Sequence, residues 1–165
     1  MRLRPYIASL DYEVVSRWIT DARTNALWCA GQLPFPFERE PFDRFLQDMA
    51  RQNAACPFVA ATDEGQLIGF FLYSADTAAN EGKFRCIMVD PACRGRGFGR
   101  EMLRLAVKYA FEITKVQTVQ LNVFSVNTGA VKCYEAVGFT VRERFEDALR
   151  YENEVWERYN MVLRP

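Results

Sequence analysis

Residues 94–100 form a glycine-rich turn, Arg-Gly-Arg-Gly-Phe-Gly-Arg, between a predicted strand at Phe84–Val89 and a helix predicted from about Gly97 to Ile113. A strand that leads through such a turn into a helix directs several unpaired main-chain N–H groups, and the positive helix end, to one point. Glycines let an anion approach the main chain closely, and three arginines add positive charge. The turn therefore predicts a site for a phosphate-like anion, although a solvated, basic helix start would use the same residues.

The spacing of the glycines separates three kinds of phosphate-binding turn. A nucleotide P-loop needs Gly-Lys followed by Ser or Thr, whereas Gly99 is followed by Arg100 and Glu101. A dinucleotide fingerprint that began at Gly95 would need a glycine at position 100, and the chain also lacks the repeated strand–helix units of a Rossmann sheet. A methyltransferase turn, Gly95-x-Gly97-x-Gly99, stays open as an alternative, with S-adenosylmethionine as its ligand.

The pattern of apolar residues predicts a mixed sheet with helices on its faces, an α/β chain of the α+β type. The expected strands cover residues 2–4, 57–62, 67–73, 84–89, 119–123, 139–145 and 156–163, and the expected helices cover 12–20, 41–52, 97–113 and 127–137. Asp11 is expected to cap the first helix, and the prolines between Trp28 and Phe37 are expected to keep that connection free of helix. With no repeat and no linker, residues 1–165 are expected to form a single domain.

Composition excludes several classes of protein. The chain has 21 basic and 21 acidic residues and no histidine, so we expect no nucleic-acid partner. Its five cysteines contain no C-x-x-C pair, which favours reduced thiols over a metal site. No apolar stretch is long enough for a signal peptide or a membrane span, so we expect a soluble, cytoplasmic protein that does not bind a membrane.

Two motifs together identify a family. Arg94-x-x-Gly97-x-Gly99, after the strand that ends at Val89, resembles the acetyl-CoA pyrophosphate loop of the GNAT superfamily of N-acetyltransferases. Further along, residues 127–139 are similar to that superfamily's second signature, N-x-x-A-x-x-x-Y-x-x-x-G-F. The resemblance implies a GNAT-like, largely antiparallel sheet of about seven strands, flanked by about four helices.

The resemblance also implies the donor and the residues that bind it. The donor is acetyl-CoA, and the residues expected to bind it are Ile87, Met88, Val89, Arg94, Gly95, Arg96, Gly97, Phe98, Gly99, Arg100, Asn127 and Tyr134. Helical geometry independently places Asn127, Ala130 and Tyr134 within about 60° of one another on one face. By the simpler interpretation, Asn127 is an N-cap and Tyr134 a half-buried core residue.

The implied reaction is direct attack of a primary amine on the thioester in a ternary complex. Tyr134 is the expected general acid, because a phenol with a pKa of about 10 can protonate a departing thiolate. The general base stays open, because many relatives have glutamate where this chain has Asn122. One alternative is a water held by Asn122, and the other is a carboxylate, either Glu81 or Asp90. The missing glutamate also motivates another interpretation, a non-catalytic CoA-binding regulatory module.

The acceptor is not identified by the sequence. It is expected to be a small molecule, a peptide N-terminus or a lysine, and a homodimer is left open. The resemblance places the segment with Trp28, Leu33, Phe35 and Phe37 on the acceptor side of the cleft, although these residues would equally serve to pack a long connection.

Overall fold

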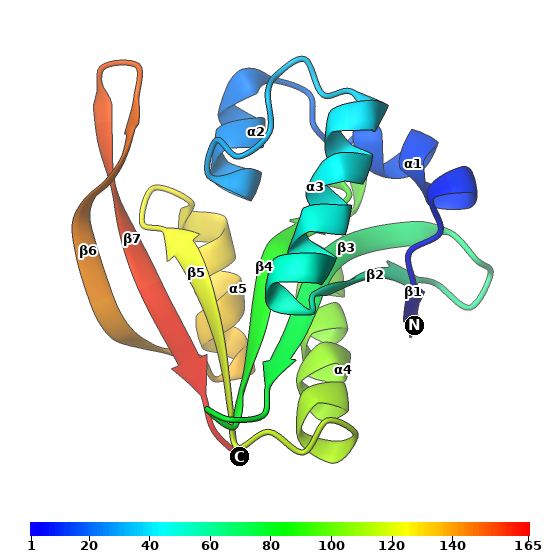
Figure 1. The fold of residues 1–165 in the computed structure, drawn as a ribbon, viewed down its shortest axis with the longest axis vertical. Helices are drawn as coiled ribbons and strands as arrows, with labels where there is room; N and C mark the ends of the chain where they lie inside the picture. The colour runs from blue at the N-terminus through cyan, green and yellow to red at the C-terminus, as the bar shows by residue number, and fades with distance from the viewer.

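A computed structural model describes residues 1–165, and its centre is one seven-stranded sheet in the order β1-β2-β3-β4-β5-β7-β6 (Figure 1). The strands are β1 (Arg2–Pro5), β2 (Cys56–Ala61), β3 (Leu67–Asp76), β4 (Glu81–Val89), β5 (Thr118–Phe124), β6 (Thr140–Tyr151) and β7 (Glu154–Leu163). Every neighbouring pair is antiparallel except β4 and β5. The predicted mixed, largely antiparallel fold is confirmed.

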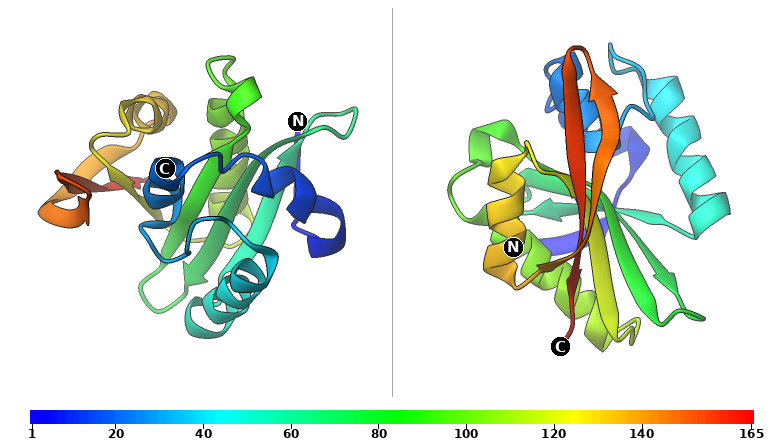
Figure 2. Two further views of the ribbon diagram at one scale, coloured as in Figure 1. Left: turned by 90° about the horizontal axis from the view of Figure 1, so that it is seen from above. Right: turned by 90° about the vertical axis from the view of Figure 1, so that its left-hand side faces the viewer.

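Helices cover both faces of the sheet (Figure 2, left). One face carries α4 (Phe98–Glu112) and α5 (Thr128–Val137), and the other carries α1 (Ala8–Ser16), α2 (Ala22–Cys29) and α3 (Arg39–Asn53). A short 3-10 turn, η1 (Pro91–Cys93), precedes the glycine-rich turn. None of the helices combines the length and the apolar composition that crossing a lipid bilayer requires.

The central strand β3 shows why the chain needs both helical layers. Phe71 and Tyr73 pack into the core on the α4 side, whereas Phe70 and Leu72 pack into the core on the α1–α3 side. A strand that is covered on both faces carries a continuous apolar run instead of an alternating one. Each such fully buried side chain contributes about 1.5–3 kcal/mol to folding. Because its side chains belong to both cores, β3 links the packing of the two helical layers.

The prediction that Asp11 caps the first helix is wrong. Helix α1 begins at Ala8, and Asp11 lies inside it with its side chain buried. Its carboxylate accepts hydrogen bonds from the Ile7 N–H at 2.7 Å and from two nitrogens of Arg4 at 2.7 and 2.8 Å. The helix starts early because Arg4 of β1 neutralises the Asp11 carboxylate, and the same carboxylate satisfies the free N–H of Ile7 at the helix start.

Helix α2 is a second departure from the predicted structure. The connection from Trp28 was expected to be free of helix, yet Trp28 and Cys29 form the last turn of α2. The helix ends at Ala30, which adopts φ +54°, before the first proline of the segment. Asp21 caps its start by accepting a hydrogen bond of 2.7 Å from the Thr24 N–H.

Strands β4 and β5 diverge along their length. They pair only between Glu81–Phe84 and Thr118–Leu121, while β4 continues against β3 and β5 continues against β7. A bulge accompanies the divergence: Phe71 of β3 stands opposite two residues of β4, and one of these, Cys86, has φ +50°. Since bulges bend the strand that carries them, this one turns β4 away from β5 and leaves a free edge on each strand.

Candidate functional site

A cleft of about 670 Å³ lies where β4 and β5 diverge. Its walls are formed by residues of β4, β5, α2, α4 and α5 and by the turn before α4. The predicted site residues that line it are Ile87, Met88, Val89, Arg94, Gly95, Gly97, Gly99, Arg100, Asn127 and Tyr134. The structure thus brings the two sequence motifs together around one cleft.

The glycine-rich turn presents a row of free donors to this cleft. Gly95 and Gly97 have φ +74° and +87°, which is the left-handed region that favours glycine. Gly97 is the N-cap of α4, and none of the main-chain N–H groups of residues 95–100 donates a hydrogen bond within the chain. Six unpaired donors and a positive helix end at one place match the chemistry of an anion site.

Gly99 lets the turn pack closely against its neighbours. A Cβ at this position would lie 3.3 Å from Sγ of Cys133 on α5 and 3.3 Å from Cγ2 of Val89 on β4. Such contacts are tighter than ordinary packing, so a larger residue would push α4 away from both elements. Gly99 therefore fixes the width of the cleft at this end.

The arginines of the turn differ in their positions. Arg94 donates from Nε to the Val89 carbonyl at 3.2 Å, and this bond ties the turn to the end of β4. Arg96 stacks on Phe98, with its guanidinium carbon 5.1 Å from the ring centre. The side chains of Arg96 and Phe98 line a separate hollow beside Met1, outside the cleft. Only the main chain of Arg96 and Phe98 belongs to the row of free donors.

Tyr134 on α5 reaches the cleft from a buried position. Its ring packs edge-on against Phe139 with 6.3 Å between ring centres, and its hydroxyl makes no hydrogen bond within the chain. Burial raises the pKa of Tyr134 above its ordinary value, and the neighbouring Cys133 adds to the effect. The phenol is therefore protonated at neutral pH and can act as a proton donor.

Asn127 acts as the N-cap of α5. Its side-chain oxygen accepts a hydrogen bond of 3.3 Å from the Ala130 N–H. The interpretation of Asn127 as an N-cap is thus confirmed, and the residue also lines the cleft. Its amide NH₂ group has no partner within the chain and is free to bind a ligand.

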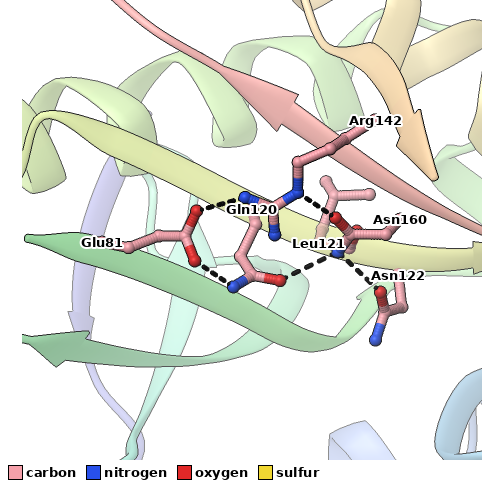
Figure 3. A network of polar contacts seen from close by, with 6 residues as sticks. All are labelled: Glu81, Gln120, Leu121, Asn122, Arg142 and Asn160. Atoms are coloured by element: carbon pink, nitrogen blue, oxygen red, sulfur yellow. Dashed lines mark hydrogen bonds and ion pairs between the residues drawn. The ribbon is translucent and has the colours of Figure 1, made fainter. Parts of the chain in front are cut away.

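Asn122 on β5 belongs to a polar network across four strands (Figure 3). Its Oδ1 accepts a hydrogen bond of 2.9 Å from Nδ2 of the buried Asn160, whose own Oδ1 accepts from Nε of Arg142 at 2.7 Å. Because a guanidinium has no acceptor, Arg142 fixes which way the Asn160 amide points. Asn122 therefore keeps its NH₂ group free, and this residue lines the cleft as a donor.

Neither carboxylate considered as a base lies in the cleft. Glu81 sits at the paired end of β4, where it forms an ion pair with Arg142 at 2.7 Å and a hydrogen bond with Gln120. Asp90 accepts a hydrogen bond of 2.9 Å from the Ala92 N–H and so caps η1. No aspartate, glutamate or histidine lines the cleft, and no cluster of residues suited to a metal ion is found.

Helix α2, which the sequence pattern did not predict, covers the cleft opposite α5. Thr24, Leu27 and Trp28 line the cleft, and Trp28 donates from Nε1 to the Cys86 carbonyl at 2.7 Å. Arg23 pairs with Glu154 at the start of β7, which anchors α2 to the β6–β7 hairpin. The cap formed by Asp21 and Thr24 was the sequence signal that predicts this helix.

The other aromatic and apolar residues proposed for the acceptor side do not line the cleft. Leu33 and Phe37 belong to the core on the α1–α3 side, and Phe35 is 42% exposed. Of this group, only Trp28 reaches the cleft.

Residues 20–139 match the model of a protein family described as "Acetyltransferase (GNAT) family". The spermine/spermidine N(1)-acetyltransferase of Bacillus subtilis is 28% identical over 82 residues, which cover 46% of this chain and 54% of that protein. The chain thus spans about half the length of that relative. The peptidyl-lysine N-acetyltransferase YjaB of Escherichia coli is 31% identical over 124 residues, covering 73% of this chain and 76% of that protein.

Solved structures share the fold over the whole chain. The spermidine N-acetyltransferase of Vibrio cholerae, solved in complex with CoA and spermine, has a TM-score of 0.82 at 21% identity and covers 99% of this chain and 94% of its own. The ribosomal-protein-S5-alanine acetyltransferase of Vibrio fischeri has a TM-score of 0.76 at 18% identity, covering 98% and 91%.

Proposed function

Because this chain belongs to the GNAT family of acetyltransferases, we propose that it transfers the acetyl group of acetyl-CoA to a primary amine. The observation that carries the proposal is the row of six unpaired N–H donors at residues 95–100, at the mouth of a cleft that Tyr134 also lines. The anion-binding turn suits the diphosphate of a thioester carrier such as acetyl-CoA. The buried proton donor in the same cleft suits the thiolate that leaves when the thioester reacts.

The cleft offers a distinct contact for each part of the donor. The diphosphate would lie on the N–H groups of residues 95–100, with Arg94, Arg100 and Lys132 around it. The pantetheine arm would pair with the free edge of β4 at Ile87–Val89, in the way that an extended peptide adds to a sheet edge. A volume of about 670 Å³ lies within the range of about 300–1,000 Å³ that is usual for small-molecule sites.

The transfer itself would be a direct attack in a ternary complex. The neutral amine attacks the thioester carbonyl, whose oxygen gains negative charge that the free N–H groups of β4 would stabilise. The C–S bond then breaks, the Tyr134 hydroxyl gives its proton to the departing sulfur, and the amide nitrogen loses its extra proton. That proton returns to Tyr134 through solvent, so the phenol is regenerated.

The acceptor amine must lose a proton before it attacks, and the cleft contains no carboxylate or imidazole to accept it. We propose that the amine binds in its neutral form and that bulk water takes the proton. We also propose that residues 1–165 act as one domain and that the five free cysteines reflect a reducing compartment such as the cytoplasm.

A CoA-binding regulatory module is a second candidate, since Asn122 cannot act as a base. The experiment that separates the candidates measures thermal stabilisation by acetyl-CoA and by S-adenosylmethionine, followed by release of free CoA thiol with a panel of amines. Stabilisation by acetyl-CoA together with amine-dependent thiol release supports the acetyltransferase. Stabilisation without thiol release supports the regulatory module, and stabilisation by S-adenosylmethionine alone contradicts both.

A further inference from the structure

The charged residues that line the cleft are all basic. Arg94, Arg100 and Lys132 lie beside the glycine-rich turn, where the diphosphate would bind. Arg85 lies at the opposite end, directly after the last paired residue of β4, Phe84. This last arginine is too far along β4 to belong to the diphosphate site, so its charge needs another explanation.

Arg85 is one of three cations that share a face of the sheet. Side chains two residues apart on a strand point to the same face, so Lys83 and Arg85 lie together on β4. Arg158 of β7 stands opposite Phe145 and stacks on its ring, with 4.5 Å from the guanidinium carbon to the ring centre. We call Lys83, Arg85 and Arg158 the cationic face; of the three, Arg85 lines the cleft, and Lys83 and Arg158 add their charge from beside it.

Lys83 lies close enough to both arginines to be affected by their charge. Burial lowers the pKa of Lys83 from its ordinary value, and repulsion from Arg85 and then Arg158 lowers it further. Among the groups that act on Lys83, the one carboxylate is Glu81, and Arg142 already pairs with it at 2.7 Å. The positive charge of the cationic face is therefore not neutralised within the chain.

None of the three cations forms an ion pair. Arg85 donates to the hydroxyl of Ser74 at 2.7 Å and to the side-chain oxygen of Asn53 at 3.4 Å, and both partners are neutral. The Nε of Arg158 is buried and has no hydrogen-bond partner. Partly buried charges without a counter-ion raise the free energy of the folded protein. We therefore expect an anion to bind at this face when the protein is active.

Asn122 adds a neutral donor beside the cationic face. Arg142 orients the Asn160 amide, which in turn holds Oδ1 of Asn122, so the NH₂ group of Asn122 has no partner in this network (Figure 3). Asn122 also lines the cleft. Asn122 and Arg85 line the same cleft from the two strands that diverge. Together they offer N–H donors to an oxygen anion at the end of the cleft away from the diphosphate site.

We propose that the acceptor is a primary amine that also carries a carboxylate, and that this carboxylate binds at the cationic face with Asn122. The inference rests on the proposed acetyl transfer and names the substrate class for that same cleft. It separates this chain from relatives named for spermine and spermidine, because a polyamine would place further ammonium groups beside unneutralised cations. The same positive charge favours loss of the proton from the acceptor's ammonium group, which suits a cleft without a base.

The test compares amines that differ only in the group at their far end. Glycine, β-alanine, γ-aminobutyrate and δ-aminovalerate are each matched with the corresponding amide and the corresponding diamine, and kcat/KM is measured by thiol release. For one or more of the amino acids, we expect kcat/KM to exceed that of the matched amide by about 10- to 100-fold, the effect of losing a hydrogen bond to a charged group. We expect kcat/KM to exceed that of the matched diamine by a larger factor. Peptides with a glutamate near a free amine form a separate arm, which distinguishes a peptide source of the carboxylate from a small molecule.

Variants test whether the cationic face causes the preference. Lys83→Gln and Arg158→Gln should each reduce the carboxylate-to-amide ratio about tenfold, and Lys83→Glu should shift the preference toward the diamine. Lys108→Gln, on the exposed side of α4, is the matched control and should leave the ratio unchanged. Unaltered acetyl-CoA affinity, measured by calorimetry, shows that each variant is folded.

Equal or better turnover of the amides or diamines by the wild-type protein overturns the inference. If acetyl-CoA binds but no amine releases thiol, the proposed function fails, and binding of the same amino acids to the CoA-loaded protein, followed by NMR, tests the site directly. Binding to the wild type that Lys83→Glu abolishes supports the carboxylate site even then, and absence of binding contradicts it.

Discussion

The side-chain amide of Asn160 on β7 donates a hydrogen bond from Nδ2 to Oδ1 of Asn122 on β5, at a distance of 2.9 Å. This bond turns the NH₂ group of Asn122 toward the cleft and occupies its oxygen. At the position where a base was sought, the chain therefore presents a hydrogen-bond donor. The proposed mechanism accordingly assigns removal of the amine proton to water and not to a residue of the cleft.

The pH dependence of kcat/KM follows from this arrangement. Because no carboxylate or histidine lines the cleft, we expect kcat/KM to rise about tenfold per pH unit until the pKa of the free acceptor amine is reached. Two acceptors with different amine pKa values should therefore show inflections that differ by the same amount. An inflection common to both acceptors near pH 5–7 would instead indicate a base on the protein.

Tyr134→Phe tests the proton donor. The ring still packs on Phe139, so stability and acetyl-CoA affinity should change little, while kcat should fall by about 10²–10⁴-fold. Tyr109→Phe, which removes a hydroxyl from α4 outside the cleft, is the matched control and should keep full turnover. Because the pKa of Tyr134 is raised by burial, the wild type should not lose activity through ionisation of this phenol below a pH of about 10. Unchanged kcat in Tyr134→Phe removes this residue from the acid role.

Trp28→Phe tests the part that α2 plays in the cleft. The change deletes the hydrogen bond to the Cys86 carbonyl and keeps most of the aromatic packing, so the free energy of unfolding should fall by about 1 kcal/mol. The KM for the acceptor should rise several-fold, with acetyl-CoA affinity unchanged. Trp18→Phe, at a buried tryptophan in the core on the α1–α3 side, should alter stability without altering KM. Equal effects of the two variants on KM would argue against a specific contact of α2 with the acceptor.

The Arg4–Asp11 pair makes a prediction about stability and pH. Burial alone would raise the pKa of Asp11, but the hydrogen bonds from Arg4 and from the Ile7 N–H outweigh it and lower the pKa below its ordinary value. A carboxyl with a lowered pKa stabilises the fold at neutral pH, and that contribution is lost as the pH falls through the unfolded pKa of about 4 toward the folded one.

Asp11→Asn should accordingly lower the free energy of unfolding by about 3 kcal/mol at pH 7, because Arg4 loses its buried partner. The difference from wild type, measured by urea unfolding, should shrink below pH 4. Asp63→Asn, at a side chain that is 77% exposed, is the control and should change stability by no more than about 0.5 kcal/mol. A difference that stays constant down to pH 2 would contradict the assigned ion pair.

Local patterns predicted the parts of the fold that depend on local chemistry. The glycine-rich turn and the Asn127 cap are short motifs whose backbone conformation and hydrogen bonds depend on residues that are neighbours in the sequence. Both were placed correctly. Helix α3 was placed from the spacing of Phe42 and Phe45, which are its buried residues. These features follow from periodicity and capping alone.

Contacts between residues of different helices and strands could not be predicted in this way. Asp11 looks like a helix cap in the sequence, and only the position of Arg4 on β1 explains why it lies inside the helix. Asn122 and Asn160 meet because β5 and β7 pair in one particular register, and a shift of one residue would separate them. The divergence of β4 depends on a bulge at Cys86, a residue type that gives no local signal for positive φ.

The glycine-rich turn is the centre of the account, and acetyl-CoA binding to Gly97→Glu tests it most directly. Gly65→Glu is the matched control, because Gly65 also has a positive φ but lies in the β2–β3 turn, away from the cleft. By calorimetry, the wild type and Gly65→Glu should bind acetyl-CoA alike, while Gly97→Glu should show no binding, since its carboxylate would repel the diphosphate and its φ of +87° disfavours a side chain. Unaltered acetyl-CoA affinity in Gly97→Glu would contradict the assignment of the turn as the diphosphate site.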